Sequence, residues 1–366
     1  MTRQKLVMVG NGMAGVRALE ELLKLAPDLH DITVFGAEPH PNYNRIMLSP
    51  VLAGEQTIDE IILNDWQWYA DNHITLHTGF TVTDVDRVRR VVSASSKDGD
   101  VITAEYDRLI MATGSNPFIL PVPGKDLQGV LAYRDIADTQ AMIDAAATYK
   151  HAVVIGGGLL GLEAANGLMK RGMHVTVVHA APWLMERQLD NVAANLLQQS
   201  LAERGMHFLL GAQTHELVGT DEGSTHADGN PPAPRVRAVR FKDGTEVAAD
   251  LVVMTVGVRP NTALAERMRL HVNRGIVVSD TLQTTTDPRI YAVGECAAHR
   301  GTAYGLVAPL FEQGKVLANH LAMHGIGRYT GSLTSTKLKV TGIDLFSAGE
   351  FMGGEHTEEI TLSDPL

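Results

Sequence analysis

The sequence predicts an α/β protein with two Rossmann-like dinucleotide-binding domains of the three-layer ββα type, followed by the start of a C-terminal α+β domain. Three observations predict this fold. An apolar segment at 6–9 runs into G-x-G-x-x-G at 10–15 and then into helical periodicity. The same order recurs at 152–155 and 156–161. Later apolar segments also end in glycine, as buried parallel strands do where they meet a ligand-binding edge.

The first glycine motif needs each of its three glycines for a different reason. Gly10 allows the tight turn after the strand, Gly12 lets the backbone approach a pyrophosphate, and Gly15 lets the following helix pack closely. The helix then directs its N-terminal amides at the phosphates. One such motif can be an ordinary turn, but two in the same strand–loop–helix context predict two dinucleotide sites.

Composition excludes several classes of function. The 366 residues are enough for two or three domains, and 45% hydrophobic with 20% charged residues is typical of globular proteins. The net charge of −11, without a basic cluster, disfavours nucleic-acid binding. No segment approaches the ~20 apolar residues of a membrane span. We therefore expect a cytoplasmic protein that binds neither nucleic acid nor membrane.

The sequence contains one cysteine, Cys296. A single cysteine excludes an internal disulfide, C-x-x-C redox chemistry and a cysteine-bound iron–sulfur cluster within this chain. We expect no metal site.

In the first domain, 32–35 reads as the second strand, and Glu38 follows about 20 residues after the last glycine, where an acid can bind a ribose. The alternative is a solvated loop carboxylate. Arg45 lies in the next loop and is either a phosphate ligand or a surface charge. Trp66 and Trp68 are better explained by packing than by flavin stacking.

Strand patterns occupy 74–110, with a hairpin turn at 97–100. An apolar strand at 109–112 ends in a tight turn at Thr113 and Gly114, and prolines then mark a crossing between domains.

The second domain repeats this order. Its second strand at 175–178 ends at His179, where an acidic residue would indicate NAD, and Arg187 lies nearby. A basic residue there suits a 2′-phosphate, so the choice between NADH and NADPH stays open. A helix follows at 190–204, and we interpret the polar, proline-rich segment 219–234 as a mobile hairpin tip between strands.

The remaining sequence returns to apolar strands. One covers 251–256, and another at 290–293 leads to Gly294 and Glu295, whose carboxylate suits a sugar-alcohol hydroxyl. A helix follows at 309–321. The new strand material after 333 is roughly 34 residues, below the ~40 that a fold usually needs, so we expect a C-terminus that is cut short or depends on a partner.

Taken together, these motifs resemble the pyridine-nucleotide-disulfide oxidoreductase superfamily. They are the two glycine motifs, Ala-Thr-Gly at 112–114, Val-Gly-Val-Arg-Pro-Asn at 256–261 and Ile-Tyr-Ala-Val-Gly-Glu at 290–295. Tyr-Asn-Arg at 43–45, Leu-Met-Glu-Arg-Gln-Leu-Asp at 184–190 and Gly-Leu-Val-Ala-Pro at 305–309 narrow the resemblance. They look like the N-terminal flavin module of the NAD(P)H-dependent nitrite reductase large subunit.

The resemblance implies an FAD-binding domain at 1–117 and 249–328, an NAD(P)H-binding domain at 118–248 and a partial domain at 329–366. The residues implied for FAD are Gly10, Gly12, Met13, Ala14, Gly15, Glu38, Arg45, Ser49, Val82, Thr113, Gly114 and Glu295. The residues implied for NADH or NADPH are Gly156, Gly158, Leu160, Gly161, Glu163, His179 and Gly257, with Glu163 near the nicotinamide carboxamide.

The implied activity is that of an FAD-dependent NAD(P)H dehydrogenase module. Its electrons would pass to an iron–sulfur and sirohaem centre that reduces nitrite to ammonia, in domains missing from this chain or in a separate iron–sulfur protein. Pro50 stands where relatives carry a cysteine or a lysine near the flavin, so no catalytic residue is predicted. The alternatives are a free-standing NAD(P)H:ferredoxin or rubredoxin reductase and a non-enzymatic flavin-binding regulatory protein.

Overall fold

A computed structural model describes residues 3–220, 234–340, 342–349, 351–353, 355–358, 360 and 362. The chain forms two compact units, and each unit consists of three separate stretches of sequence. Unit 1 comprises Met1–Leu48, Gln56–Pro117 and Val258–Ser332, and unit 2 comprises Ser49–Glu55, Phe118–Gly257 and Leu333–Leu366.

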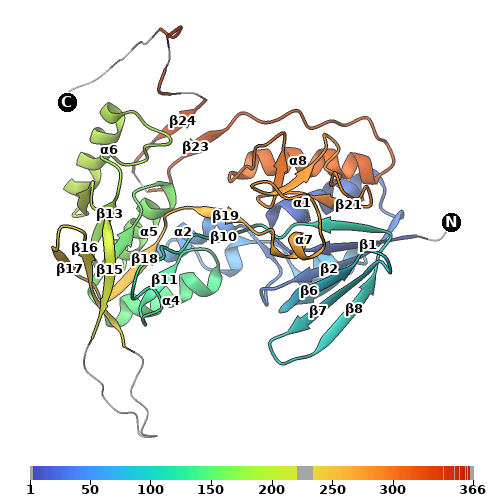
Figure 1. The fold of residues 1–366 in the computed structure, drawn as a ribbon, viewed down its shortest axis with the longest axis horizontal. Helices are drawn as coiled ribbons and strands as arrows, with labels where there is room; N and C mark the ends of the chain where they lie inside the picture. Colours follow the sequence, from blue (N-terminus) through green and yellow to red (C-terminus); the bar gives the residue numbers. More distant parts are fainter. Residues whose placement is uncertain are drawn as a thin grey trace, which may run out of the picture. The chain divides into compact units, whose positions relative to one another are not determined.

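The centre of unit 1 is a five-stranded parallel sheet (Figure 1). Its order is β21 (Ile290–Ala292), β9 (Arg108–Met111), β1 (Gln4–Val9), β2 (His30–Gly36) and β5 (Thr75–Thr78). The register pairs Leu6 with Ile32 on one side of β1 and with Arg108 on the other. Both faces of the sheet are covered, which explains why the central strand β1 carries a continuous apolar run at residues 6–9 rather than an alternating pattern.

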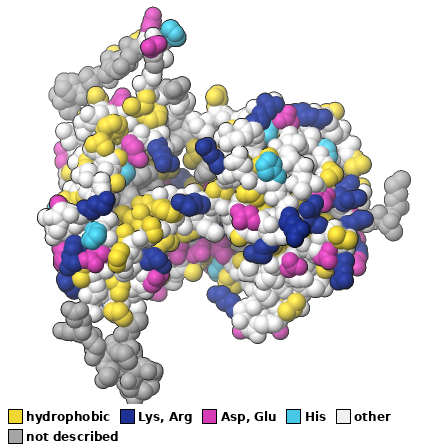
Figure 2. Space-filling model, viewed as in Figure 1, with side chains coloured by type: hydrophobic (Ala, Val, Ile, Leu, Met, Phe, Trp, Pro, Cys, Tyr) yellow, Lys and Arg dark blue, Asp and Glu magenta, His cyan; other side chains and the backbone are white. Residues whose placement is uncertain are grey.

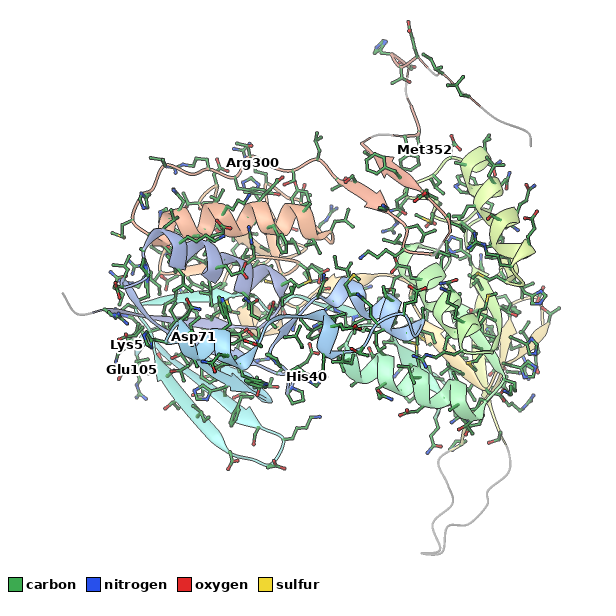
Figure 3. The ribbon with its side chains drawn as sticks, turned by 180° about the vertical axis from the view of Figure 1, so that it is seen from behind. Lys5, His40, Asp71, Glu105, Arg300 and Met352 are labelled. Carbon is green, nitrogen blue, oxygen red and sulfur yellow. The ribbon has the colours of Figure 1, made fainter. Side chains whose placement is uncertain are left out.

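Two further layers enclose this sheet. Helices α1 (Met13–Leu25) and α8 (Val307–Leu321) pack on one face, and an antiparallel sheet of β6 (Phe80–Asp86), β7 (Val91–Ser96) and β8 (Val101–Glu105) lies on the other (Figure 1). Leu19, Met8 and Val92, one from each layer, are fully buried in one core. The Lys5 ammonium and the Glu105 carboxylate form an exposed ion pair of 2.6 Å between β1 and β8 (Figure 3).

The other elements of unit 1 are short. They are β3 (Asn42–Tyr43), η1 (Arg45–Met47), η2 (Asp59–Ile61), β4 (Ile62–Asn64), α3 (Trp66–Asp71), β10 (Ser115–Pro117), β19 (Val258–Pro260), α7 (Ala263–Arg267), β20 (Ile276–Val278) and β22 (Ala297–His299). Trp68 packs against the core as predicted, whereas Trp66 is 53% exposed, so the packing interpretation was wrong for Trp66.

Unit 2 repeats the architecture. Its parallel sheet has the order β11 (Val130–Ala132), β18 (Leu251–Met254), β12 (His151–Ile155), β13 (His174–His179) and β14 (His207–Leu210). The helices are α2 (Leu48–Leu52, of this unit from Ser49), α4 (Ile136–Thr148), α5 (Leu159–Lys170) and α6 (Asn191–Glu203). An antiparallel sheet of β15 (Thr214–Gly219), β16 (Val236–Phe241) and β17 (Glu246–Ala248) shares its core. The predicted α/β fold with two Rossmann-like domains is confirmed.

The observed units differ from the predicted segments at several boundaries: residues 49–55 lie in unit 2 and not with the first FAD segment, and residues 329–332 lie in unit 1. Strand β18 pairs in parallel with β12, Val252 opposite Val153, so residues 249–257 belong to unit 2 and not to the second part of the FAD domain. The C-terminal strands β23 (Ser335–Lys337) and β24 (Phe346–Ala348) also belong to unit 2. Of the expected hairpin tip, residues 221–233 lie outside the described residues, while β15 and β16 on either side pair antiparallel.

The surface of the described residues carries mixed charge. Figure 2 shows Lys and Arg side chains scattered among Asp and Glu side chains over the visible face. Within the described residues, no helix combines the length and the hydrophobicity that crossing a membrane requires.

Candidate functional site

The first glycine loop lies at the carboxyl end of β1, where the chain order of the sheet reverses between β9 and β2. Gly10 has a φ of +105°, and a Cβ there would lie 2.1 Å from the carbonyl oxygen of Ala112. A Cβ on Gly15 would lie 2.8 Å from that of Ala112. A Cβ on Gly12 would meet no atom within 4 Å. The fold itself therefore demands the outer two glycines, but not Gly12.

The second loop, after β12, shows the same division. Gly156 has a φ of +122°, and its Cβ would lie 2.5 Å from the carbonyl oxygen of Thr255. A Cβ on Gly161 would lie 1.8 Å from the carbonyl oxygen of Gly156, whereas one on Gly158 would meet nothing within 4 Å. Each loop thus keeps an open space beside its middle glycine, at the edge where parallel sheets bind ligands.

The helices that follow the two loops begin without a side-chain cap. Gly12 and Gly158 are the N-cap residues of α1 and α5, and neither helix has an acidic residue in its first turn. By contrast, Asp135 and Asp190 cap α4 and α6 with their carboxylates. The first backbone N–H groups of α1 and α5 can therefore donate hydrogen bonds to an anion, and the partial positive charge of each helix N-terminus favours its binding.

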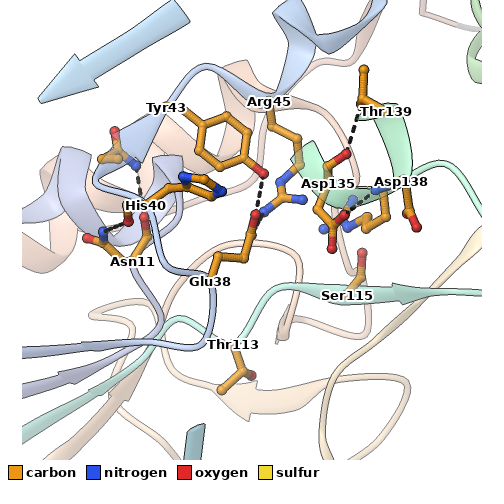
Figure 4. A network of polar contacts seen from close by, with 12 residues as sticks. Asn11, Glu38, His40, Tyr43, Arg45, Thr113, Ser115, Asp135, Asp138 and Thr139 are labelled. Atoms are coloured by element: carbon orange, nitrogen blue, oxygen red, sulfur yellow. Dashed lines mark hydrogen bonds and ion pairs between the residues drawn. The ribbon is translucent and has the colours of Figure 1, made fainter. Parts of the chain in front are cut away.

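Glu38 follows β2 at the same edge of unit 1 (Figure 4). Its carboxylate accepts a hydrogen bond of 2.7 Å from the Tyr43 hydroxyl and pairs with the Arg45 guanidinium at 2.5 Å. The guanidinium also stands over the Tyr43 ring, 5.2 Å from its centroid. Glu38 and Arg45, both predicted as site residues, are thus brought together, and the half-buried Glu38 carboxylate is held by two neighbours.

Hydrogen bonds from neighbouring segments hold the first loop in place. The Tyr69 hydroxyl donates to Asn11 Oδ1 at 2.7 Å, and Asn42 Nδ2 donates to the Asn11 carbonyl oxygen at 3.0 Å. Burial raises the pKa of Tyr69 well above its usual range. Sequence reasoning missed these three residues, because nothing in the spacing relates residues 42 and 69 to residue 11.

Two more predicted residues lie on the ends of neighbouring strands. Thr113 Oγ1 donates to the carbonyl oxygen of Asn261 at 2.7 Å, next to Gly114 with its φ of +66°. The Glu295 carboxylate accepts from the Ser115 hydroxyl at 2.8 Å. A Cβ on Gly294 would lie 2.9 Å from that of Ala14, so the turn before Glu295 passes directly over the start of α1.

The other residues predicted for FAD are more dispersed. Met13 and Ala14 begin α1, and Val82 is buried in β6. Ser49 belongs to unit 2, where its hydroxyl donates to the Glu163 carboxylate at 2.6 Å.

In unit 2, both ring nitrogens of His179 are engaged. The backbone amide of Gly157 donates to Nδ1 at 3.1 Å, and Nε2 lies 2.9 Å from Glu186 Oε2. Because Nδ1 accepts a hydrogen bond, a neutral ring carries its hydrogen on Nε2, and Nε2 then donates a hydrogen bond to Glu186. The Met185 amide donates to the Gly157 carbonyl oxygen at 3.0 Å and ties this turn to the loop. Arg187 is exposed.

Glu163 lies in the second turn of α5 and is only 6% exposed. Besides Ser49, the backbone amide of Lys339 donates to this carboxylate, at 3.1 Å from Oε1. The Tyr133 hydroxyl lies 3.4 Å from the Ser49 hydroxyl. Burial raises the pKa of Glu163, and the hydrogen bonds from Ser49 and Lys339 partly oppose that shift. Sequence reasoning missed Tyr133 and Lys339.

Leu160 is the second residue of α5, and Gly257 has a φ of +108° with open space where a Cβ would be. Among the described residues, no group of three or more His, Cys, Asp and Glu side chains is arranged to hold a metal ion. Cys296 is buried, and its thiol donates to the carbonyl oxygens of Met111 and Val293 at 3.4 Å.

The sequence pattern of the pyridine nucleotide-disulphide oxidoreductase family matches residues 4–320. The chain belongs to this family. The match covers both glycine loops and the strand ends described above, so the repeated architecture is that of this oxidoreductase family.

Two curated relatives come from Bacillus subtilis (strain 168). The chain is 56% identical to a nitrite reductase [NAD(P)H] over 364 residues, which is 100% of this chain and 43% of that protein. It is 49% identical to an assimilatory nitrate reductase electron transfer subunit, again over 364 residues, 100% of this chain and 45% of that protein. This family member therefore spans less than half the length of these relatives.

A solved structure extends the comparison. The covalent putidaredoxin reductase–putidaredoxin complex matches with a TM-score of 0.82 at 29% sequence identity, over 95% of this chain and 82% of that chain.

Proposed function

We propose that the chain is an FAD-dependent NADH dehydrogenase module that supplies electrons to an iron–sulfur and sirohaem centre for the reduction of nitrite to ammonia. The observation that carries the proposal is the pair of glycine loops, each with an open space beside its middle glycine and an uncapped helix behind it. Family membership and the two nitrite- and nitrate-metabolism relatives give the reaction class.

The residues of unit 1 fit FAD. A pyrophosphate beside Gly12 would accept hydrogen bonds from the first amides of α1. Glu38, held by Tyr43 and Arg45, offers a carboxylate to a ribose, and Glu295 offers one to the ribityl hydroxyls. When bound, flavin supplies the chemistry of accepting a hydride and releasing its two electrons singly. The chain's own residues bind and orient, and none needs to act as a general acid or base.

The residues of unit 2 fit a nicotinamide dinucleotide, and Glu186 favours NADH as the donor. A ribose 2′-hydroxyl can donate to a carboxylate, whereas a 2′-phosphate would be repelled by it. His179 does not compensate for that repulsion, because its Nδ1 accepts from Gly157 and its Nε2 faces Glu186. We therefore assign NADH, used in the cytoplasm, as the electron donor.

The electron acceptor would be an iron–sulfur and sirohaem region outside the 366 residues. The sequence contains one cysteine, and that thiol is buried, so the chain has no ligand set for such clusters. The relatives' greater length leaves room for the acceptor.

An absorption spectrum of the purified chain, followed by anaerobic titration with NADH and then with NADPH, tests the proposal. We expect flavin bands that are bleached by stoichiometric NADH and far less readily by NADPH. A spectrum without flavin after reconstitution with FAD, or a bound flavin that neither nucleotide bleaches, would contradict the dehydrogenase function.

A separate protein acceptor is the second candidate. It is favoured by the match to the putidaredoxin reductase structure, of which the chain covers 82%. Reduction of an added small iron–sulfur protein at a rate comparable to flavin bleaching would support this free-standing reductase over the nitrite-reducing assembly.

A further inference from the structure

Glu163 is a buried carboxylate on α5, the helix that follows the second glycine loop. It lies five residues after Gly158, on the helix whose first amides face the open space. A buried carboxylate is costly unless it is hydrogen-bonded and its charge is balanced. The groups that surround it therefore decide whether it is ionised.

The hydrogen bonds to Glu163 leave part of its capacity unused. Each carboxylate oxygen can accept two hydrogen bonds. Oε2 accepts one from Ser49 and Oε1 accepts one from Lys339 N. An ionised Glu163 thus retains acceptor capacity for a ligand's N–H group, whereas a protonated one would present a hydroxyl and lose part of that capacity.

The hydrogen bond from its backbone amide places Lys339 next to the Glu163 carboxylate. Glu163 and Lys339 attract each other electrostatically. Burial lowers the pKa of the Lys339 ammonium, and the attraction of Glu163 opposes that shift. The other titratable group beside this cluster is Tyr133, whose pKa is raised well above its usual range by burial, so it is neutral and contributes no charge.

The C-terminal segment that carries Lys339 is held firmly within unit 2. Leu338 and Val340, on either side of Lys339, are each 2% exposed. The Arg204 guanidinium donates to the Gly342 carbonyl oxygen at 2.8 Å, and the Ser347 hydroxyl donates to the Gln188 carbonyl oxygen at 2.6 Å. Strand β23, on the same segment, carries Lys337, which is exposed. The segment therefore presents two lysines in different surroundings.

We propose that Lys339 is a positioning residue of the nucleotide site: it keeps Glu163 ionised, so that the carboxylate accepts a hydrogen bond from the amide nitrogen of the nicotinamide carboxamide. This inference rests on the proposed NADH function. It assigns a role in dinucleotide recognition to the C-terminal segment, far in sequence from either glycine loop. Lys339 acts through Glu163 and does not itself touch the reacting atoms.

The test compares NAD⁺ with ADP-ribose, which lacks the nicotinamide ring, by calorimetric titration of the purified chain across the neutral pH range. Lys339→Met removes the ammonium, Lys339→Arg retains a charge, and Lys337→Met is the matched control on the same segment. For Lys339→Met we expect about tenfold weaker NAD⁺ binding, the size of one hydrogen bond to a charged group, and unchanged ADP-ribose binding. Lys339→Arg should retain most of the NAD⁺ affinity, and Lys337→Met all of it.

The pH dependence separates charge from structure. Without the ammonium, the pKa of Glu163 rises further. As the pH is lowered, the affinity of Lys339→Met for NAD⁺ should therefore begin to decrease at a higher pH than that of the unsubstituted chain. Equal losses for NAD⁺ and ADP-ribose, or an unchanged NAD⁺ affinity and pH profile in Lys339→Met, would overturn the inference. If the unsubstituted chain binds neither NAD⁺ nor ADP-ribose, the proposed function fails and this inference fails with it.

Discussion

Replacing Gly12 by alanine should separate flavin binding from folding. Gly12 has φ −86° and ψ 173°, a conformation that alanine adopts without strain, and its Cβ would meet no protein atom within 4 Å. Such a substitution stabilises a protein by about 0.4–1 kcal/mol, because it restricts the unfolded chain. The same Cβ would fill the space that a pyrophosphate needs. We therefore expect a folded chain that has lost most of its affinity for FAD.

The magnitude follows from ligand linkage. Free FAD at about 100 times its Kd stabilises the folded chain by about 2.7 kcal/mol. A tenfold weaker affinity removes about 1.3 kcal/mol of that gain. Flavin absorbance per protein, together with thermal unfolding with and without added FAD, measures both effects.

Two matched variants sharpen the experiment. Gly158→Ala makes the same change in the second loop, where φ is −84°, and should keep flavin but lose NADH binding. Gly10→Ala should fail to fold, since its Cβ would lie 2.1 Å from the carbonyl oxygen of Ala112 at a φ of +105°. Full flavin content in Gly12→Ala, or loss of flavin only through unfolding, would refute the reasoning about the open space.

Three other changes test separate features. Glu186→Arg should raise the preference for NADPH over NADH by at least about tenfold, measured as the ratio of kcat/KM values. The change replaces a charge that repels the 2′-phosphate with one that attracts it. An unchanged ratio would show that Glu186 does not contact the ribose. Glu163→Gln should weaken NAD⁺ binding less at low pH than at high pH, relative to the unsubstituted chain. The pKa of Glu163 is raised, so at low pH the unsubstituted carboxylate is itself protonated and accepts hydrogen bonds less well. Parallel pH profiles of the two chains would contradict this. His30 is buried, and burial lowers its pKa to about 4. As pH falls from about 6.5 to about 4, this histidine therefore becomes protonated in the unfolded chain but stays neutral in the folded chain, which favours unfolding. That window should cost up to about 3 kcal/mol of stability, and His30→Leu should abolish this loss in urea unfolding at two pH values; an equally steep loss would exclude His30 as its source.

Local patterns predicted the features that depend on neighbouring residues. The two strand–loop–helix starts, the ends of β9 and β21 and the helix containing Pro309 follow from apolar runs, glycines and caps within a few residues of each other. They were predictable because a tight turn or a close helix contact restricts the residue type at that position.

Features that depend on tertiary pairing were not predictable. Nothing in residues 251–254 distinguishes pairing with β12 from pairing with β9, since any apolar run suits a strand that is buried on both faces. The sequence left the choice between NADH and NADPH open at His179, because the bond from Gly157 and the contact with Glu186 arise only in the folded chain. The partners of Glu163 lie 114 and 176 residues away from it in the chain.

The separation between Glu163 and Lys339 has a consequence for biosynthesis. At about 5–20 residues per second, a ribosome that has added Glu163 needs roughly 9 to 35 s to add the 176 further residues up to Lys339. During that interval α5 and its glycine loop are already made, but the carboxylate lacks the amide and the cation that balance it in the finished protein. The nascent second unit therefore completes its interior only when the C-terminal segment emerges, so a stop codon before residue 339 would leave a chain with a buried, uncompensated charge.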